Sequence, residues 1–555
     1  MIMLTVLIIL GTIFQGVIMF RSGVMYDFGI GYWGPLARDG VWHEALIGQL
    51  LKSIPSGNPG LAGEVLTNYH YFYDLIISLI SRFGVPVNFL IYRFFPIVFS
   101  ILLGIGTYKL SLVLFKDLPA GRQAKKVAFL SVFFAYFASS FGWIINVVKG
   151  EQIGGESTFW ANQPVSMNLN PPFAISLIII IFTLLLVNSY LNKPKFIKAV
   201  LIIIFSGTLI GFKVYAGIIL LFGLIVLGIK KLYFEKDTKV LLIAISSLLI
   251  SLAILLPQSK SALGLLEFNP LWLVNTMIDA GDRVGIADLT SKRFTYLGSH
   301  QWLKFSIVEI IGLLIFFIGN LGSRIIGIFG IKKDQLKNDL FIIIFSIFII
   351  SFVPTLIFTQ KGNPWNIIQF FYYFLFFAGL FAAYSLRKAR FAIIALVILI
   401  TPISSVATFR SWLYPNPPAY LPTREYEALK FLSTQGDGTV LKHPFDQSMR
   451  SKFKDPFPLA VYADNAYISA YSGKSVYIED VEQQIVLNTD YKKRLESADR
   501  FFIEKDLIWS GKFLKDNNIQ YIYLPKIYQL PMAEGLYPIK KIFENEETNI
   551  YKVLE

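Results

Sequence analysis

The chain of 555 residues is 54% hydrophobic and only 16% charged, a composition that excludes an ordinary soluble globular protein and predicts a membrane protein. It contains no cysteine, so disulfides and thiolate metal sites are excluded. The formal net charge of +14 does not indicate nucleic-acid binding, because from Arg410 onward 19 basic residues face 20 acidic ones and the excess lies in the earlier part of the chain.

Eleven apolar runs are predicted to cross a membrane, because a span needs about 20 mostly apolar residues. The first run has no charge at its start and no small-residue cleavage site after it, so we expect a retained anchor. Segments 199–211 and 214–229 are short, and the alternative is one broken hairpin that does not cross fully on each leg. The eleven runs are 2–20, 89–115, 127–148, 172–191, 199–211, 214–229, 240–257, 305–330, 339–358, 367–386 and 391–408.

The short connections rich in Lys and Arg predict the orientation of the chain, since such loops stay in the cytoplasm. The longer connections and the C-terminal tail then lie outside, which requires that 71–83 is an amphipathic helix on the outer surface and not a span. We therefore expect a multi-pass protein of the plasma (cell) membrane with an extracytoplasmic C-terminal domain. The basic connections are 116–126, 192–198, 230–239, 331–338 and 387–390, and the outer ones are 21–88, 149–171 and 258–304.

The first long outer connection holds two of the four histidines of the chain. Each lies four residues from an aspartate, in Asp39-Gly-Val-Trp-His43 and in His70-Tyr-Phe-Tyr-Asp74. Residues four apart share one face of a helix. We therefore predict that each Asp/His pair faces one side of an amphipathic surface helix.

These pairs suit general base catalysis, in which the carboxylate deprotonates an acceptor hydroxyl and the imidazole orients it. They could instead bind a divalent cation, although the chain has neither an HExxH motif nor a three-ligand spacing. The remaining interpretation is that the polar residues only cap helices or face water. The two helices are predicted over 39–51 and 68–83, so their polar faces could enclose a site beside the bundle.

Apolar spans, a long first outer connection with acidic residues and surface helices, and a polar C-terminal domain together resemble the GT-C superfamily. These are membrane glycosyltransferases that use polyprenyl-phosphate sugars as donors. The Asp-x-x-Trp-His…Tyr-His-Tyr-x-x-Asp pattern is also similar to one found in uncharacterised bacterial members. The architecture covers nearly the whole chain, whereas the motif covers only about 21–96.

The resemblance implies that an acidic residue early in the first outer connection acts as base or metal ligand. Asp27 and Asp39 both match that position, and we favour Asp39 because His43 lies beside it. The chain departs from the family in lacking the adjacent Asp-Glu pair that many members carry after the first span. The resemblance also implies an acidic residue in the second outer connection, which corresponds to Glu151 or Glu156.

Further candidates would contact the substrate, and His70 and Asp74 would shape the sugar or acceptor site. Lys213 lies between two apolar runs, where a charge is costly unless it is paired or faces a polar cavity. It would hold the donor phosphate and stabilise the departing anion, or it is simply a lysine at a hairpin tip. The connection 258–304 could form a lid in which Arg283 or His300 contacts phosphate, or it is a solvated loop.

The predicted fold class is an α-helical polytopic membrane protein with a small C-terminal soluble α/β domain. We expect a GT-C-like transmembrane domain over 1–408 and an outer-facing domain over 409–555, after the stiff Pro415-Asn416-Pro417-Pro418 boundary. The strands predicted in the latter are 438–441, 475–478, 519–524 and 549–553, and its helices are 424–432 and 481–502.

The sequence thus favours a membrane glycosyltransferase of the cell envelope that moves a sugar from a polyprenyl-phosphate donor to a glycan, lipid or protein acceptor. The direct displacement would invert the anomeric centre, and the only cofactor considered is a possible divalent cation. The expected partners are that donor, the acceptor and membrane lipid, with no nucleic acid. The alternatives are a non-catalytic protein of surface polysaccharide assembly, or a transporter or flippase for a lipid-linked solute.

Overall fold

A computed structural model describes residues 2–116, 118, 122–154, 156–259, 266–413 and 416–554. The chain divides into two compact units. Met1–Val17 with Pro96–Ser411 form the membrane unit, and Ile18–Phe95 with Trp412–Glu555 form the head unit. This division differs from the predicted boundaries, because the first outer connection groups with the C-terminal segment and not with the spans.

Nine helices in the described part of the chain are long and apolar enough to cross a membrane, and a pair bent by 53° would make a tenth. Every predicted run is helical, so the multi-pass prediction is confirmed. The nine are α1 (Ile2–Arg21), α4–η2–α5 (Val87–Phe89, Leu90–Phe94, Phe95–Leu114), α10 (Pro171–Asn192), α12 (Val214–Glu235), α13 (Lys239–Gln258), α16–η3 (Trp302–Leu321, Gly322–Gly330), α17 (Asp339–Ile357), η5–α18–η6 (Pro364–Ile367, Ile368–Ser385, Leu386–Lys388) and α19–α20 (Phe391–Ile400, Ile403–Leu413), and the bent pair is α6 (Arg122–Phe137) with α7 (Gly142–Val148).

The region predicted as a possible broken hairpin forms two separate helices. α12 has 22 residues and is long enough to cross, so the hairpin interpretation is wrong for this leg. α11 (Phe196–Phe212) has 17 residues and is one of the shorter apolar helices. Only Lys213 separates them, with extended backbone at φ −160° and ψ 115°.

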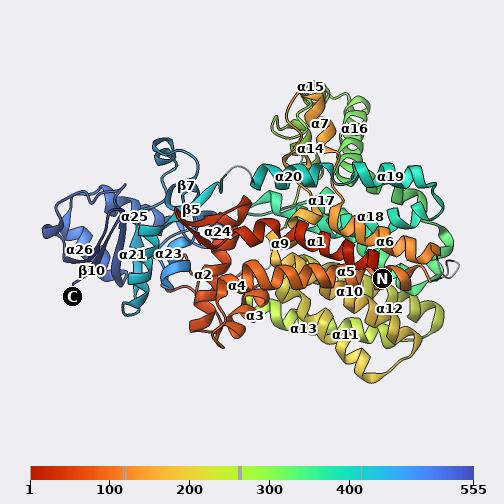
Figure 1. Ribbon diagram of the computed structural model, residues 1–555, viewed down its shortest axis with the longest axis horizontal. Coiled ribbons are helices and arrows are strands. Elements are labelled where there is room, and N and C mark those ends of the chain that lie inside the picture. The colour runs from red at the N-terminus through yellow and green to blue at the C-terminus, as the bar shows by residue number, and fades with distance from the viewer. Residues whose placement is uncertain are drawn as a thin grey trace. The chain divides into compact units, whose positions relative to one another are not determined.

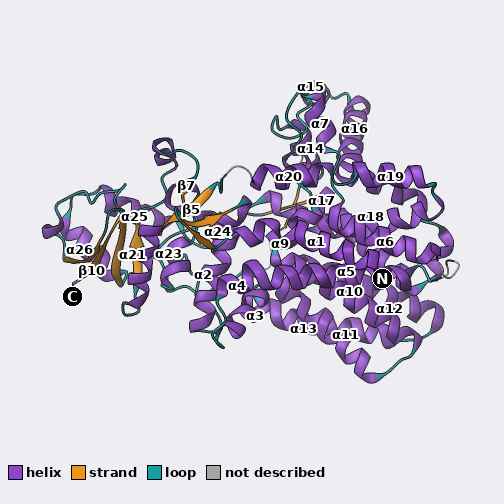
Figure 2. Ribbon diagram, in the orientation of Figure 1, coloured by secondary structure: helices purple, strands orange, loops and turns teal. Residues whose placement is uncertain are grey.

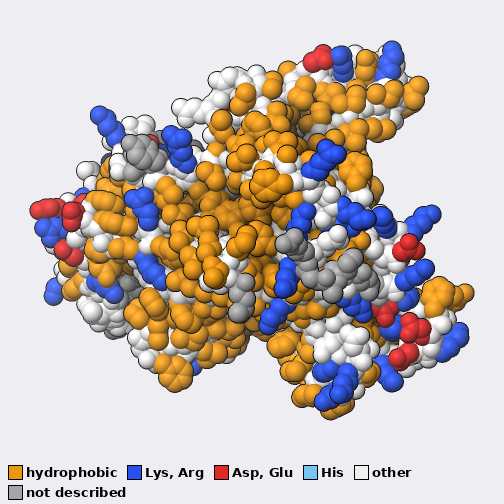
Figure 3. Space-filling view, turned by 45° about the vertical axis from the view of Figure 1, so that its right-hand side comes forward, with side chains coloured by type: hydrophobic (Ala, Val, Ile, Leu, Met, Phe, Trp, Pro, Cys, Tyr) orange, Lys and Arg blue, Asp and Glu red, His pale blue; other side chains and the backbone are white. Residues whose placement is uncertain are grey.

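Helix α18 is the central helix of the membrane unit, because 89% of its apolar window is buried. It packs against α6, α17 and η3, with Phe371 and Phe374 stacked among the rings of Phe348 and Phe352 from α17. A helix that is apolar all round is suited to such a position. The outer helices instead leave large apolar side chains exposed, and Figure 3 shows a broad hydrophobic face with Lys and Arg side chains gathered toward one part of it.

The outer connections of the membrane unit are partly helical. The predicted lid contains α14 (Trp272–Asp279) and α15 (Ala287–Gly298), which pack on α16, so its described part is not a solvated loop. Its first strand, β3 (Leu266–Phe268), pairs with β4 (Phe358–Gln360). The second outer connection contributes α8 (Glu156–Phe159) and α9 (Gln163–Leu169), and η4 (Lys333–Lys337) precedes α17.

The head unit contains two four-stranded sheets, drawn in orange in Figure 2. The first has the order β1-β2-β5-β7 and joins two distant segments, since Gly29 pairs with Pro422 and Tyr32 with Ala419. The second has the order β6-β8-β10-β9. The strands are β1 (Val24–Tyr26), β2 (Gly29–Tyr32), β5 (Ala419–Pro422), β6 (Thr439–Lys442), β7 (Phe457–Pro458), β8 (Ile519–Pro525), β9 (Ile539–Glu544) and β10 (Thr548–Val553).

The C-terminal segment agrees with the prediction of a mixed α/β domain but differs in detail. The predicted strand 475–478 is only an isolated bridge between Val476 and Val440, and the predicted helix 481–502 is two helices. Strands β5, β7 and β9 were missed. The helices are α21 (Thr423–Thr434), η7 (Gln447–Lys452), α22 (Leu459–Tyr462), α23 (Tyr467–Ser472), α24 (Val481–Val486), α25 (Lys492–Ile503), α26 (Leu507–Asp516) and η8 (Glu534–Leu536).

Helix α2 (Asp39–Lys52) is a core helix of the head unit and not the surface helix that its sequence predicted. Val41 to Ile47 are all buried, because α23 and α3 (Phe72–Ser81) pack against it. The connection after α2 is held by a two-way hydrogen bond between the Asn58 and Gln484 amides, with N···O distances of 2.8 and 3.3 Å. The C-terminal segment therefore covers the face of α2 that the sequence left open to solvent; Figure 1 labels α2, α3 and α23.

Candidate functional site

The first outer connection brings together a histidine and an aspartate that are not the predicted partners. His43 Nδ1 on α2 lies 2.7 Å from Asp74 Oδ1 on α3, and both side chains are buried. His70, the predicted partner of Asp74, precedes α3 and is not on a helix. The predicted pairing within each helix is therefore wrong, because a bond between α2 and α3 joins one member of each pair.

This contact provides a hydrogen bond to only one of the two carboxylate oxygens of Asp74. Its second oxygen, Oδ2, is buried and has no hydrogen-bond partner among the described residues. Burial raises the pKa of Asp74, while the charge of His43 and the hydrogen bond to it lower that pKa in part. A carboxylate accepts hydrogen bonds, so His43 Nδ1 donates to Asp74 Oδ1.

Tyr69 interacts with other candidate residues of the first outer connection. His70 stacks on it with ring centroids 5.0 Å apart and planes at 9°. Burial raises the pKa of Tyr69 well above its ordinary value, and the carboxylates of Asp74 and Asp39 raise it further. His70 therefore lies against the Tyr69 ring, and the charges of Asp74 and Asp39 act on the Tyr69 hydroxyl.

Asp39 is the exposed member of this group, at the first position of α2. Its carboxylate, with Asp480 and Glu482, raises the pKa of Arg38 against the lowering effect of burial. Arg38 also forms an ion pair with Glu482. Asp39 thus combines solvent access with a place in the first turn of a helix.

The C-terminal segment adds residues that the sequence gave no reason to select. The guanidinium of Arg450 lies 4.4 Å from the Phe457 ring centre and 5.6 Å from that of Tyr462. Burial raises the pKa of Tyr462, Arg450 lowers it and Asp39 raises it, so both charges act on one hydroxyl. Only the pairing of strands from distant segments could reveal this neighbourhood.

Glu44, which directly follows His43, is a buried carboxylate that the sequence analysis missed. Its Oε1 accepts hydrogen bonds from Tyr92 at 2.6 Å and Tyr32 at 3.3 Å, and Tyr32 also shares a short hydrogen bond with Tyr471. Burial raises the pKa of Glu44 to about 7, although the three tyrosine hydroxyls lower it. A glutamate in an otherwise apolar helix segment was the signal available in the sequence.

Asp27 does not belong to this group of side chains. It lies in the two-residue turn between β1 and β2, where Tyr26 pairs with Gly29, and it is exposed. The structure therefore supports Asp39 over Asp27 as the first-connection carboxylate with neighbouring functional groups.

In the membrane unit, Lys213 is 3% exposed and occupies the break between α11 and α12. Its Nζ donates to Asn170 Oδ1 at 3.2 Å and lies 5.7 Å from the Tyr215 ring centre. The Tyr215 hydroxyl donates to Gln360 at 2.5 Å, and Asn170 Nδ2 lies 3.5 Å from Gln369 Oε1. The predicted phosphate contact of Lys213 stays a prediction, and the described partners of its ammonium are an amide oxygen and an aromatic ring.

The other residues predicted for the substrate site lie in the outer connections of the membrane unit, and they are Arg283, His300, Glu151 and Glu156. Arg283 lies over Trp160 at 3.9 Å and near Trp365 at 5.3 Å, so its guanidinium already takes part in cation–π contacts. His300 is exposed, with a left-handed backbone at φ 56°. Glu151 is exposed, and Glu156 is the first residue of α8, but its side chain lies outside the described part of the structure.

The described side chains do not provide three protein ligands for one metal ion. Within the described residues no three His, Asp or Glu side chains come together as candidate ligands. His43 and Asp74 offer only two, and they bind each other through Nδ1 and Oδ1.

No protein-family model and no curated protein matches the chain. Among solved structures, the crystal structure of the Archaeoglobus fulgidus oligosaccharyltransferase in complex with Zn and sulfate matches 94% of this chain and 68% of its own, with a TM-score of 0.50 and 13% identity. This chain is similar in fold to that oligosaccharyltransferase.

Two more structures from the same organism are similar at 12% identity, again over 94% of this chain. One is the oligosaccharyltransferase tethered by a disulfide bond to an acceptor peptide containing the NVT sequon, at a TM-score of 0.49 over 68% of its chain. The other is the archaeal oligosaccharyltransferase AglB in complex with an inhibitory peptide and a dolichol-phosphate, at 0.48 over 69%. At these identities the likeness concerns the fold.

Proposed function

We propose that this protein is a membrane glycosyltransferase that moves a sugar from a polyprenyl-phosphate donor to an acceptor on the outer face of the cell membrane. The observation that carries the proposal is the exposed carboxylate of Asp39 in one neighbourhood with the buried His43–Asp74 pair, in a chain similar in fold to an oligosaccharyltransferase. Fold by itself does not fix an activity, so the proposal depends on the chemistry of these side chains.

Asp39 acts as the base in this proposal. It accepts the proton of the acceptor nucleophile while that atom bonds to the anomeric carbon. The bond from that carbon to the donor phosphate breaks, its electron pair stays on the phosphate oxygen, and the configuration inverts. His43 is a positioning residue whose Nδ1 is held by Asp74, so the imidazole keeps one orientation one helical turn from Asp39.

Separately, and within the membrane unit alone, Lys213 contacts the phosphate of the lipid-linked donor in this proposal. Its ammonium is buried, donates to Asn170 Oδ1 at 3.2 Å and lies 5.7 Å from the Tyr215 ring centre. Charge stabilisation is stronger in a site that excludes water. The role of Arg283 is then to hold the Trp160 and Trp365 rings in the outer connections of the membrane unit.

The test uses the purified full-length protein with a panel of polyprenyl-phosphate sugars and candidate acceptors, and measures release of free lipid phosphate together with product. We expect activity that falls at least a hundred-fold in Asp39→Asn, roughly the contribution of a general base. The matched control is Asp490→Asn, another exposed head-unit aspartate, which should retain activity. Equal activity in both variants would remove Asp39 from the mechanism.

The same assay separates the rival functions. Folded protein that releases no lipid phosphate from any donor, with all acceptors present, would favour the non-catalytic or transport function over the transferase. Loss of release in Lys213→Met, with release retained in Lys109→Met on the exposed side of α5, would support the phosphate role of Lys213.

A further inference from the structure

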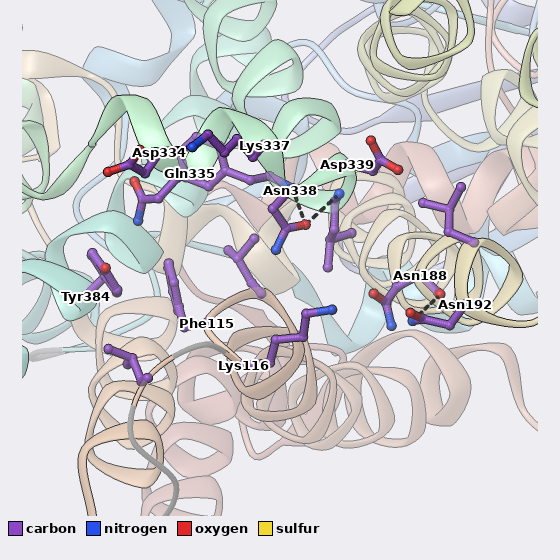
Figure 4. A pocket seen from close by; sticks show the side chains of 15 residues that line it. Phe115, Lys116, Asn188, Asn192, Asp334, Gln335, Lys337, Asn338, Asp339 and Tyr384 are labelled. Atoms are coloured by element: carbon purple, nitrogen blue, oxygen red, sulfur yellow. Dashed lines mark hydrogen bonds and ion pairs between the residues drawn. The ribbon is translucent and has the colours of Figure 1, made fainter. Parts of the chain in front are cut away.

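A cavity of about 620 Å³ lies within the membrane unit, where three of the Lys/Arg-rich connections come together. Its walls come from the C-terminal ends of α5 and α10, the segment before α17, and the end of α18 (Figure 4). These segments are predicted to face the cytoplasm, so the cavity is at the opposite end of the spans from the predicted outer connections.

The lining of this cavity is polar on one part and apolar on another. The polar part includes Lys116, Asn188, Asn192 and residues of the segment 334–339, and the apolar part includes Leu191 and Phe341. Phe115 and Tyr384 close one wall as a ring stack with centroids 4.5 Å apart. A lining of this kind matches a molecule with a polar head and an aliphatic tail.

The Lys116 ammonium is the cation available for a ligand. Figure 4 shows it directed into the cavity toward the amides of Asn338 and Asn188. Its side chain has no ion pair or hydrogen bond among the described residues, whereas Asn338 Oδ1 is used in capping Leu340 N and Phe341 N at 3.0 and 3.4 Å. The Asn338 amide nitrogen therefore remains as a donor beside the lysine.

The two carboxylates of the lining do not cancel this charge. Asp339 forms ion pairs with Lys230 at 2.6 Å and Lys231 at 2.7 Å. Asp334 lies 3.5 Å from Lys337, and both side chains are more than four-fifths exposed, where an ion pair contributes little. The part of the cavity around Lys116 is thus a site for an anion held by one ammonium and several amides.

We propose that this cavity binds the headgroup of a membrane phospholipid, with the phosphate against Lys116 and the acyl chains along Leu191 and Phe341. Basic pockets between spanning helices on the cytoplasmic side bind lipid headgroups in this way. The site is separate from the residues assigned to sugar transfer and does not depend on that activity.

Native mass spectrometry of the detergent-purified full chain tests this proposal. The probes are phosphatidylglycerol, phosphatidylethanolamine and diacylglycerol with the same acyl chains, the last of which lacks the phosphate. We expect retention of both phospholipids and not of diacylglycerol. Lys116→Ala should lower phospholipid retention roughly ten-fold, and Lys116→Arg should restore part of it.

The matched control is Lys239→Ala, an equal charge change at an exposed lysine of α13 that does not line the cavity. Equal retention by the Lys116→Ala and Lys239→Ala variants would overturn the proposal, and so would retention of diacylglycerol at the same level. Displacement of the phospholipids by millimolar inorganic phosphate would show a site for a soluble anion and would also overturn it.

Discussion

His43 Nδ1 and Asp74 Oδ1 lie 2.7 Å apart although 31 residues separate them in the chain. The bond joins α2 to α3 and replaces the two local Asp/His pairs that helix periodicity predicts. It leaves Asp39 exposed and removes Asp74 from solvent. The two aspartates of the motif therefore have different surroundings, since Asp39 is exposed and Asp74 is buried beside the histidine.

Asp74→Ala should destabilise the protein, because it leaves the imidazole of His43 buried without its carboxylate. Breaking a buried pair from one side costs about 3 kcal/mol. We expect a lowered thermal midpoint in detergent for Asp74→Ala and for His43→Ala, and less than the sum of the two effects in the double variant. Strictly additive effects would mean that the two side chains do not interact.

Glu44 should make stability depend on pH. Its pKa is raised by burial to about 7 in the folded protein, above its ordinary value, so the folded state binds this proton more tightly than the unfolded state. The stabilisation is complete below the ordinary pKa and is lost as pH rises through about 7, with a total of about 3 kcal/mol.

Glu44→Gln removes this titration while it keeps a hydrogen-bond acceptor for Tyr92. Between pH 5 and pH 8 the thermal midpoint of the wild type should fall more steeply than that of Glu44→Gln. Glu425 and Glu479, whose pKa values burial raises to about 8, contribute a slope of the same sign to both proteins. Identical slopes in the two proteins would contradict the assignment.

Arg324 in η3 is a guanidinium at 1% exposure in the membrane unit. Its Nη2 donates to Ala138 O at 2.7 Å, while Nε and Nη1 have no hydrogen-bond partner among the described residues. A buried charge of this kind is costly, and an apolar side chain of similar length removes that cost. We expect Arg324→Met to be at least as stable as the wild type in thermal unfolding, and a midpoint several degrees lower would show that the guanidinium has further partners.

The absence of native cysteine permits a direct test of orientation. We expect Glu496→Cys, at an exposed position of α25, to react with a membrane-impermeant maleimide in intact cells. Lys195→Cys, in a basic connection before α11, should react only after the membrane is opened. The opposite pattern would reverse the predicted orientation, and with it the proposed outer-face acceptor.

Spanning helices could be predicted because the length of an apolar run is a local property. Each of the eleven runs is helical in the structure, including the 17-residue α11 and the bent pair α6–α7. The helix at the Lys213 break was harder to judge, since run length does not distinguish a short span from half of a hairpin. The 22 residues of α12 decide that case.

The predicted surface helix 39–51 shows where local pattern fails. Its polar positions Asp39 and His43 indicated a face toward water, yet His43 is buried, and so is the neighbouring Glu44. The partners that satisfy them are Asp74, Tyr32 and Tyr92, the first from the next helix and the other two from segments on either side. A helical pattern reports which residues share a face but not what covers that face.

The amino-acid sequence was sufficient for the membrane class, the apolar spans and three of the six strands described in the C-terminal segment, β6, β8 and β10, and it offered Asp39, His43, His70 and Asp74 as candidates. The three-dimensional fold was needed to show that His43 belongs with Asp74, and that β2 pairs with β5 across almost 390 residues, from Tyr32 to Ala419. The reason is physical: hydrophobic run length and helix periodicity act between near neighbours in the chain, whereas the burial and partner of a polar side chain depend on whichever distant segment excludes water from it.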